Sequence, residues 1–277
     1  ARAGDLPAGP FRLVVGFAAG GSIDTLARML ARRFAEATGR SWIVENRSGA
    51  GGTIGAASVA RAPGDGTTLL LGESGSIAIS PAIQPALGYD PLRDLPPVTL
   101  LATQAVALVT NARGPATIPE LVERARARPG SIRNGTAGVG NPTHLFGVDL
   151  ARRLGIEIEH VHYRAGGGAA AVALLNDEVQ IAFPGVAGAV RQIQAGQYRP
   201  LGVGDAQPVG ELPGVPPIAQ FAPGFSAAFW FGLHAPAATP PATVAALNAA
   251  LVPALREPAF LGVLTTGGYR VATGSPE

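Results

Sequence analysis

Three glycine-rich loops follow predicted strands, and their residue types could hold an anion. They span residues 17–22 and 138–143 and the segment that holds Ser74 and Ser76. In an open α/β sheet, ligands bind beyond the carboxyl ends of the strands. Backbone N–H groups there, together with the positive end of a helix dipole, attract an anion without a cationic side chain. We therefore expect anion binding, although each loop alone also fits an ordinary turn between a strand and a helix.

Residue types that carry catalysis are scarce. The chain has no lysine and no cysteine, which excludes Schiff-base chemistry, a P-loop lysine, thiol catalysis and thiolate metal ligands. The residues around Ser74 nearly match the nucleophile elbow G-x-S-x-G, but Ser76 occupies the position of the last glycine. We predict no catalytic residue.

The histidines are the candidates for a metal site. His160 and His162 share one face of a predicted strand, but no nearby carboxylate or third histidine completes a set, so we predict no metal. His144 follows the loop of residues 138–143. We expect it to anchor that loop by hydrogen bonds, and a direct contact with a ligand is the alternative.

A second motif suggests a different class of protein. Gly49, Gly51 and Gly55 give G-x-G-x-x-x-G between a strand and a helix, and Glu73 stands at the end of the next strand. This arrangement imitates a dinucleotide fingerprint with its ribose-binding acid, although its spacing is one residue too long. The alternative function is therefore an NAD-dependent oxidoreductase that uses these glycines and Glu73.

A βαβαβ rhythm positions the first loop and the Ser74 segment. Residues 11–17 are a short apolar run typical of a buried parallel strand, and strands are also predicted at 42–45 and 68–71. Apolar residues at helical spacing predict a helix that begins with Ser22 as its N-cap and holds Asp24 in its first turn. A second helix is expected over 53–61. The pattern predicts a parallel sheet with helices on its faces.

Two long apolar segments divide the chain. Residues 98–110 predict one strand that leaves the first sheet for a second, and residues 225–233 predict the return. Between them, strands near 131–136, 159–163, 179–183 and 200–203 alternate with helices. We predict a discontinuous first domain, residues 1–103 with 226–277, and an inserted second domain, residues 104–225. The two crossing strands would form the hinge.

Composition excludes several classes. Hydrophobic residues make up 47% of the 277 residues, enough to fill a core, which excludes intrinsic disorder. A formal net charge of +2 is too small for a nucleic-acid surface, and no apolar run reaches the length of a membrane span. Ala1, Arg2 and Ala3 have the small-x-small form that precedes a signal-peptidase cut, with simple trimming as the alternative.

A set of motifs in fixed order resembles the Bug family, the solute-binding proteins of tripartite tricarboxylate transporters. The motifs are FAAGGSID from Phe17, VENRSGAGGTIG from Val44, DGTTLL from Asp65, GVGNPTHL from Gly138, YR at Tyr163 and WFGL from Trp230. They cover nearly the whole chain from Pro10 onward. The resemblance explains the glycines at 49–55 as a structural turn, which displaces the dinucleotide interpretation.

The resemblance implies an α/β fold of two domains, of the type II-like Venus flytrap kind, in which each domain is a mainly parallel sheet flanked by helices. It implies a periplasmic monomer without catalysis or cofactor. Such a protein captures a small carboxylate between its domains and delivers it to the membrane components of the transporter. Nucleic acid and direct membrane insertion are not expected.

The resemblance also assigns ligand-binding residues, which join the two serines found from the loops. In the first domain they are Phe17, Gly20, Gly21, Ser22, Asp24, Ser74 and Ser76; in the second they are Thr136, Gly138, Gly140, Thr143, Phe183 and Pro184. Many family members have an aspartate where this chain has Pro184, so a ligand amine is not favoured there. No arginine lies in the loops, and Arg164 is the nearest candidate for a salt bridge.

Overall fold

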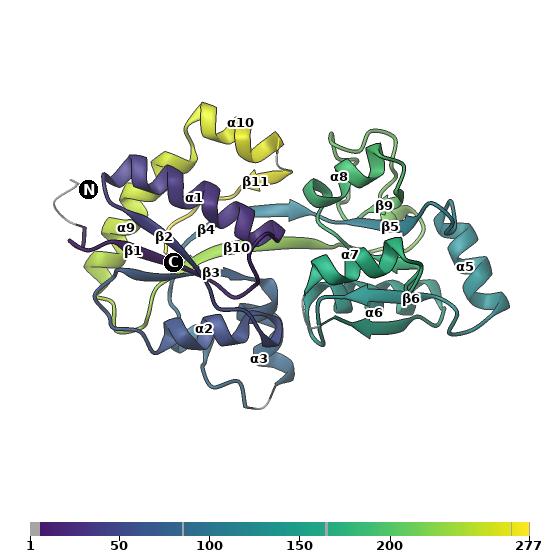
Figure 1. Ribbon diagram of the computed structural model, residues 1–277, viewed down its shortest axis with the longest axis horizontal. Helices are drawn as coiled ribbons and strands as arrows, with labels where there is room; N and C mark the ends of the chain where they lie inside the picture. Colours follow the sequence, from purple (N-terminus) through teal and green to yellow (C-terminus); the bar gives the residue numbers. More distant parts are fainter. Residues whose placement is uncertain (1–5, 85, 164–165, 267, 277) are drawn as a thin grey trace. The chain divides into compact units, whose positions relative to one another are not determined.

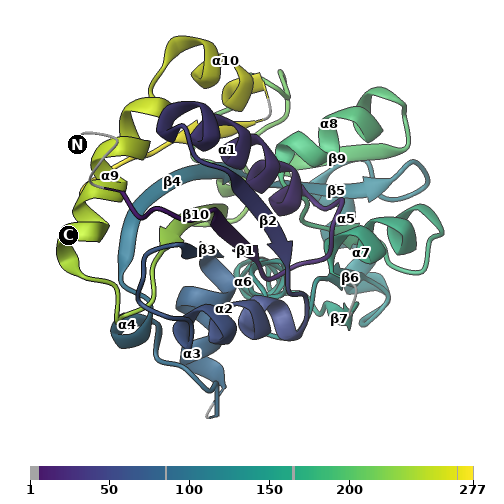
Figure 2. The same ribbon diagram turned by 60° about the vertical axis from the view of Figure 1, so that its left-hand side comes forward.

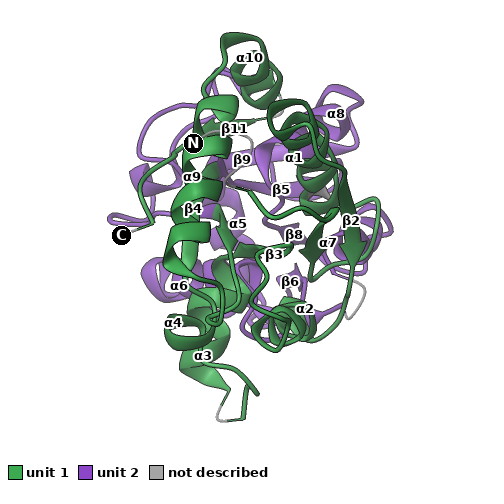
Figure 3. Ribbon diagram, turned by 90° about the vertical axis from the view of Figure 1, so that its left-hand side faces the viewer, with its two compact units in different colours: residues 1–103, 230–277 green, residues 104–229 purple. Residues whose placement is uncertain are grey.

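Two compact units make up the chain (Figure 3). The computed structural model describes residues 6–84, 86–163, 166–266 and 268–276. Unit 1 comprises Ala1–Thr103 and Trp230–Glu277, and unit 2 comprises Gln104–Phe229. The sequence placed the first boundary after residue 103 and the second after residue 225, whereas the units divide after residues 103 and 229.

A six-stranded sheet forms the centre of unit 1, in the order β11-β4-β10-β3-β1-β2 (Figure 1). Strand β1 pairs in parallel with β2 and β3, and β10 runs antiparallel to β3. The sheet is therefore mixed, with a parallel part at the N-terminal strands. The strands are β1 (Phe11–Val15), β2 (Trp42–Asn46), β3 (Thr68–Glu73), β4 (Pro97–Ala105), β10 (Ala228–His234) and β11 (Tyr269–Val271).

Both faces of β3 and, apart from Arg12, of β1 are buried, which explains their largely apolar sequences. Val14 and Leu70 pack with Ala56 and Val59 of α2. On β1, the ring of Phe11 stacks on Trp42 at 4.5 Å. Trp42 in turn contacts Phe34 of α1 at 5.0 Å. Helices α1 and α2 therefore lie on opposite faces of the sheet (Figure 2).

Unit 2 contains a five-stranded sheet in the order β7-β6-β8-β5-β9. Strand β6 is parallel to β7 and β8, and β5 is antiparallel to β8 and β9. Alternate residues of β5 face two separate cores, because side chains alternate across a strand. The strands are β5 (Ala107–Asn111), β6 (Arg133–Thr136), β7 (Glu159–His162), β8 (Ile181–Ala182) and β9 (Tyr198–Val203).

Helices cover both sheets. In unit 2, α5 and α6 pack on the core that contains Leu108, and α7 and α8 pack on the core that contains Val109. The helices are α1 (Ser22–Thr38), α2 (Thr53–Ala60), α3 (Ser80–Ile83), α4 (Pro91–Asp94), α5 (Ile118–Ala127), α6 (Pro142–Leu154), α7 (Gly167–Leu175), α8 (Val186–Gln194), α9 (Pro241–Leu255) and α10 (Pro258–Thr266). Shorter helical turns are η2 (Ala50–Gly52), η3 (Gly75–Ile79) and η4 (Ile218–Gln220).

The structure corrects three expectations about elements. The single strand expected at 98–110 is two strands, β4 and β5, and Val106 between them makes only an isolated bridge to Gly185. The N-cap of α1 is Gly21, and Ser22 is already the first helical residue. The short helices α3 and α4 and the strand β11 had no counterpart in the sequence analysis, because segments this short carry little periodicity.

The length and hydropathy of the helices bear on whether any of them could span a membrane. Over the residues described, no single helix is long and apolar enough to cross a membrane. Helices α9 and α10 together reach the required length and composition, but they are bent by 76°.

Candidate functional site

In each unit, the predicted ligand residues follow neighbouring parallel strands. Val15 of β1 is in register with Leu71 of β3, so the loop after β1 and the Ser74 segment leave the same edge of the first sheet. Gly135 of β6 is in register with Ala182 of β8, which brings the loop after β6 beside the turn of Phe183 and Pro184. The topology therefore gathers the predicted residues into one group per unit.

Asp24 organises the loop of unit 1. Its carboxylate is buried, at 3% exposure, and accepts hydrogen bonds from the Gly20 N–H (2.9 Å), the Arg28 guanidinium (3.0 Å) and Asn46 Nδ2 (2.9 Å). Asn46 Nδ2 also donates to the Phe17 carbonyl at 3.0 Å. Burial opposes ionisation, but the hydrogen bonds outweigh it and lower the pKa of Asp24 below its usual 3.8. Asp24 thus holds the loop, with its charge balanced by Arg28.

Phe17 and Ser76 meet across a glycine. A Cβ built on Gly52 would lie 3.1 Å from Cε2 of Phe17 and 3.5 Å from Cβ of Ser76. Ser74 and Ser76 are buried, at 6% and 3% exposure. The Ser74 hydroxyl has no hydrogen-bond partner among the described residues, whereas that of Ser76 donates to the Glu73 carbonyl at 3.4 Å.

Glu73 caps the helical turn η3. Its two carboxylate oxygens accept the N–H groups of Gly75 (2.6 Å) and Ser76 (2.8 Å). Burial raises the pKa of Glu73, although these hydrogen bonds oppose the shift. At 5% exposure, the carboxylate is turned toward its own chain. This geometry fits a capping residue and not a ribose ligand.

Gly55, the last glycine of the dinucleotide-like motif, has a packing role. A Cβ on Gly16 would lie 2.6 Å from the Gly52 Cα, and a Cβ on Gly55 would lie 2.8 Å from the Gly16 Cα. Real Cβ atoms do not approach backbone this closely, so only glycine fits at these positions. The motif therefore lets α2 and its preceding turn press directly against the end of β1.

The loop of unit 2 is held by uncharged groups. Asn141 is the N-cap of α6, and its Oδ1 accepts the Thr143 N–H at 3.1 Å and the Thr143 hydroxyl at 2.8 Å. The same hydroxyl accepts the Ala137 N–H at 3.0 Å. Pro142 has no N–H, so the first turn of α6 is largely satisfied within the loop.

Two glycine amides of this loop also have internal partners. The Gly138 N–H donates to Thr136 Oγ1 at 3.3 Å, and the Gly140 N–H donates to His144 Nδ1 at 3.2 Å. Gly20 in unit 1 likewise donates to Asp24. The amides of these three predicted glycines thus maintain their loops. His144 anchors its loop as the sequence analysis expected.

The turn of Phe183 and Pro184 opens α8. The Phe183 ring is in the core, 6.0 Å from Phe146, so only the backbone of this residue is available to a ligand. Helix α8 begins after Gly185, an N-cap without a side-chain hydrogen bond. Gln104 lies over that residue: a Cβ on Gly185 would be 2.2 Å from Gln104 Oε1. Gln104 is 1% exposed, and its Nε2 has no partner in the described structure.

Three further residues, Asn46, Asn141 and Gln104, belong to the loops or their surroundings but were not predicted from the sequence as site residues. Asn141 stood before a proline, a typical signal for the start of a helix, and Gln104 was a lone amide within a long apolar run. Asn46 gave no local signal, because its partners lie 22 and 29 positions away. Arg164 and the side chain of Ser22 lie outside the described part of the chain.

The histidines are closer together than the sequence suggested. We expected no third histidine near His160 and His162, but the His144 ring lies 4.8 Å from each of theirs. Even so, no group of three or more His, Asp or Glu side chains among the described residues could hold a metal ion.

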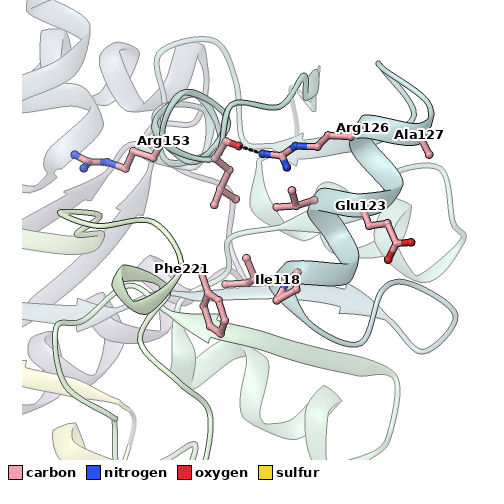
Figure 4. A pocket seen from close by; sticks show the side chains of 9 residues that line it. Ile118, Glu123, Arg126, Ala127, Arg153 and Phe221 are labelled. Carbon is pink, nitrogen blue, oxygen red and sulfur yellow. Dashed lines mark hydrogen bonds between the residues drawn. The ribbon is translucent and has the colours of Figure 1, made fainter.

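A groove of about 870 Å³ lies elsewhere in unit 2 (Figure 4). Across it, Arg126 Nη2 donates to the Leu154 carbonyl at 3.2 Å. No predicted ligand residue lines it. The lining residues come from α5, the end of α6 and the residue that follows η4: Ile118, Pro119, Val122, Glu123, Arg126, Ala127, Arg153, Leu154 and Phe221.

Two mixed sheets flanked by helices, with loops at the ends of parallel strands, define an α/β periplasmic-binding-protein fold. The family model described as the tripartite tricarboxylate transporter family receptor matches residues 26–276. The chain belongs to this family, and the predicted resemblance to Bug proteins is confirmed.

Curated relatives match over nearly the full chain. A UPF0065 protein from the tcbD-tcbE intergenic region of Pseudomonas sp. strain P51 is 36% identical over 98% of this chain and 81% of its own length. Protein BugT of Bordetella pertussis is 32% identical over 98% of this chain and 84% of its own length.

Solved structures agree with the fold. An R. palustris protein with adipate is 33% identical and superposes with a TM-score of 0.92, over 98% of this chain and 91% of that one. MatC of Rhodopseudomonas palustris with bound malate is 32% identical, with a TM-score of 0.88 over 96% and 91% of the two chains. Both neighbours carry small dicarboxylates.

Proposed function

We propose that this protein is a periplasmic solute-binding protein that captures a small dicarboxylate with loops of both units and delivers it to a tripartite tricarboxylate transporter. Family membership and the carboxylates of the two solved neighbours support the ligand class. The observation that carries the proposal is the uncharged character of the strand-end loops. The Asp24 charge is balanced by Arg28, and the unit 2 loop is built from amides and hydroxyls.

Free helix ends are the proposed donors. Because the Gly20, Gly138 and Gly140 amides have partners inside their loops, the ligand needs other N–H groups. The first N–H groups of a helix have no partner within it. We therefore assign one carboxylate to the start of α1, beside Gly21, Ser22 and Phe17, and the other to the start of α8. Ser76, Thr136 and Thr143 shape the loops around them.

Gln104 would complete the end at α8. Its Nε2 is a buried donor without a partner, and its amide lies against Gly185, the N-cap of α8. An unpaired buried donor is unfavourable, at about 1–3 kcal/mol, and a ligand oxygen would relieve that. The two chain crossings after residues 103 and 229 would serve as the hinge when both units hold the ligand.

The competing function is dinucleotide binding by Gly49, Gly51, Gly55 and Glu73. It requires exposed glycine backbone and a free carboxylate. Gly55 instead lies against the backbone of Gly16, and the Glu73 carboxylate is occupied by the N–H groups of Gly75 and Ser76. The geometry favours the carboxylate.

Calorimetry with adipate, malate, a tricarboxylate and NAD tests the proposal. We expect at least one carboxylate to bind with a Kd near 1 μM, about −8 kcal/mol, and NAD not to bind. Gln104→Leu should weaken that binding about tenfold, since one charge-assisted hydrogen bond is lost. The matched control is Gln192→Leu, which also removes a glutamine amide with a buried unpaired atom, here Oε1, on α8 away from its start, and should leave affinity unchanged. Binding of NAD with no carboxylate binding would overturn the function.

A further inference from the structure

Three histidines form a cluster behind the unit 2 loop. The His144 ring, on α6, stands edge-on to those of His160 and His162 on β7, with both pairs of centroids 4.8 Å apart. His160 Nδ1 lies 3.4 Å from Asn134 Nδ2, and His162 Nδ1 lies 2.7 Å from Thr136 Oγ1. The cluster is therefore tied to β6 through Asn134 and through Thr136, the last residue before the loop.

The contact between His144 and Gly140 fixes a protonation state. A backbone N–H can only donate, so the Nδ1 of His144 that faces the Gly140 N–H must be an acceptor. A neutral imidazole with its proton on Nε2 meets this requirement. An imidazolium carries protons on both nitrogens, and its Nδ1–H would point at the Gly140 N–H. Protonation of His144 thus replaces a hydrogen bond with two opposed donors.

Close packing leaves the loop little freedom to avoid this conflict. A Cβ on Gly147 would lie 2.3 Å from Asn134 Nδ2 and 2.9 Å from His160 Cε1, so α6 already lies against β6 and β7. Gly140 has a φ of +71°, in the left-handed region. If its amide loses the His144 partner, the loop between Thr136 and Thr143 has to rearrange.

Other charges on these elements are engaged elsewhere or lie at the far ends of the strands. On α6, Asp149 pairs with Arg152 and Arg153. Arg133 at the start of β6 contacts Gln180, and Glu159 at the start of β7 is exposed. The charges that act on His144 are those of His160 and His162.

We propose that His144 is a positioning residue that holds the ligand loop of unit 2 only while its imidazole is neutral. The charges of His160 and His162 set the pH at which this hold is lost. We call the contact between His144 and the Gly140 amide the latch. Protonation opens the loop. On the basis of the proposed function, acid would therefore weaken carboxylate binding by the protein itself, in addition to any titration of the ligand.

The electrostatics agree with the geometry. Burial, followed by the charges of His160 and His162, lowers the pKa of His144 from its ordinary 6.5 to about 4. Burial and then His162 lower the pKa of His160. The cluster thus keeps His144 neutral at neutral pH and sets the release of the loop in the acidic range.

Nuclear magnetic resonance of the ligand-free protein tests the latch without the proposed function. Imidazole nitrogens and the Gly140 amide are followed as the pH is lowered from 7.5. We expect the Gly140 amide and His144 to share one midpoint near 4. In His144→Asn, whose amide oxygen replaces the acceptor without titrating in this range, the Gly140 midpoint should disappear. A Gly140 amide that stays unchanged while His144 titrates would overturn the proposal.

A second variant can be measured if His144→Asn does not fold. His160→Asn combined with His162→Asn removes the neighbouring charges, and the Gly140 midpoint should rise but stay below 6.5, because burial still lowers the pKa of His144. An unchanged midpoint would contradict the tuning role. The buried His234 of unit 1 serves as a control for global unfolding, since its Nδ1 lies 3.0 Å from the Leu95 carbonyl, far from the cluster in sequence.

Binding is measured separately, with adipate. Below the midpoint, wild-type affinity should fall relative to His144→Asn by about tenfold per pH unit, as expected for one linked proton. Titration of adipate cancels in this ratio because both proteins meet the same ligand. A constant ratio with an intact Gly140 transition would contradict coupling to the ligand, whereas no adipate binding at any pH bears on the proposed ligand and not on the latch.

Discussion

The two ligand loops are held by hydrogen bonds to different kinds of acceptor, a charged one in unit 1 and uncharged ones in unit 2. In unit 1, an ionised carboxylate, Asp24, collects the Gly20 amide and is balanced by Arg28. In unit 2, the neutral side chains of Asn141, Thr143 and His144 collect the amides of their loop. Both arrangements present little net charge to a ligand.

The difference lies in what disables each loop. The unit 1 loop fails when its acceptor gains a proton and loses charge, at a pH below the usual range of an aspartate. The unit 2 loop fails when a neutral base becomes charged. Unit 1 also has a base in which two backbone segments lie in close contact, at Gly16 and Gly55.

The largest effect on stability is expected from Gly55→Ala, which disrupts the close contact between Gly55 and Gly16. Alanine is the better helix former, but its Cβ would stand 2.8 Å from the Gly16 Cα, and overpacking against backbone should lower the free energy of unfolding by about 3 kcal/mol. Urea unfolding measures this. Gly188→Ala in α8, where no atom lies within 4 Å of the new Cβ, is the control and should be neutral or stabilising. Equal effects of the two substitutions would show that close packing at Gly55 does not contribute to stability.

Asp24→Asn should have the next largest effect. It removes the charge that pairs with Arg28 and turns an acceptor toward the Asn46 amide into a donor, which we expect to destabilise the protein by about 2 kcal/mol and to weaken carboxylate binding. Asp149→Asn is the matched control, because Asp149 also pairs with an arginine four residues on, yet is more exposed. Exposed pairs contribute only about 0–1 kcal/mol. If both variants behave alike, Asp24 is an ordinary surface acid.

Thr143→Ala tests the hydrogen bonds among uncharged groups that hold the unit 2 loop. It should lower the free energy of unfolding by about 1 kcal/mol and weaken adipate binding by a similar amount, because the Thr143 hydroxyl bridges Asn141 and the Ala137 amide. Thermal unfolding and calorimetry with adipate are the measurements. Thr143→Ser keeps the hydroxyl and should behave as the wild type. A full loss in the serine variant would assign the effect to the methyl group.

The smallest change is expected when the pH is lowered from 7 to 6 without any substitution. The pKa of His144 is about 4 in the folded chain and 6.5 as an ordinary side chain, so unfolding takes up a proton between these values. The contribution of neutral His144 to the free energy of unfolding is fully present above pH 6.5 and is lost as the pH falls toward 4. Urea unfolding should show a slight decrease at pH 6 that deepens at pH 5. His144→Asn should flatten this slope, and an identical slope in the variant would place the proton elsewhere.

Much of the fold could be predicted because central strands such as β1 and β3 are largely buried on both faces. Largely apolar runs such as residues 11–15, which only Arg12 interrupts, are followed by helical periodicity and gave the alternation of β1 and α1. The division of residues 98–110 into β4 and β5 was missed, because Val106 is as apolar as its neighbours and only pairing reveals the break. Strand β11 has three residues, too few for any pattern.

The site was predicted in its loops but not in its supporting contacts. Glycines after strands marked the loops around Gly20 and Gly138. The partners that hold them, above all Asn46 for Asp24, come from distant parts of the chain and carry no local signal. The same holds for the meeting of His144 with His160 and His162, which depends on the approach of α6 permitted by Gly147.

The closed cap of α6 has a kinetic consequence. Asn141 and Thr143 already satisfy their loop, so a ligand would meet a surface that does not have to order itself on contact. Ordering a flexible side chain on binding costs about 0.5–1.5 kcal/mol, and a preformed loop avoids it. Association should then be fast and similar among carboxylates of one size. Discrimination between them would reside in how long each one stays, with residence time as the quantity that natural variation at these loops changes.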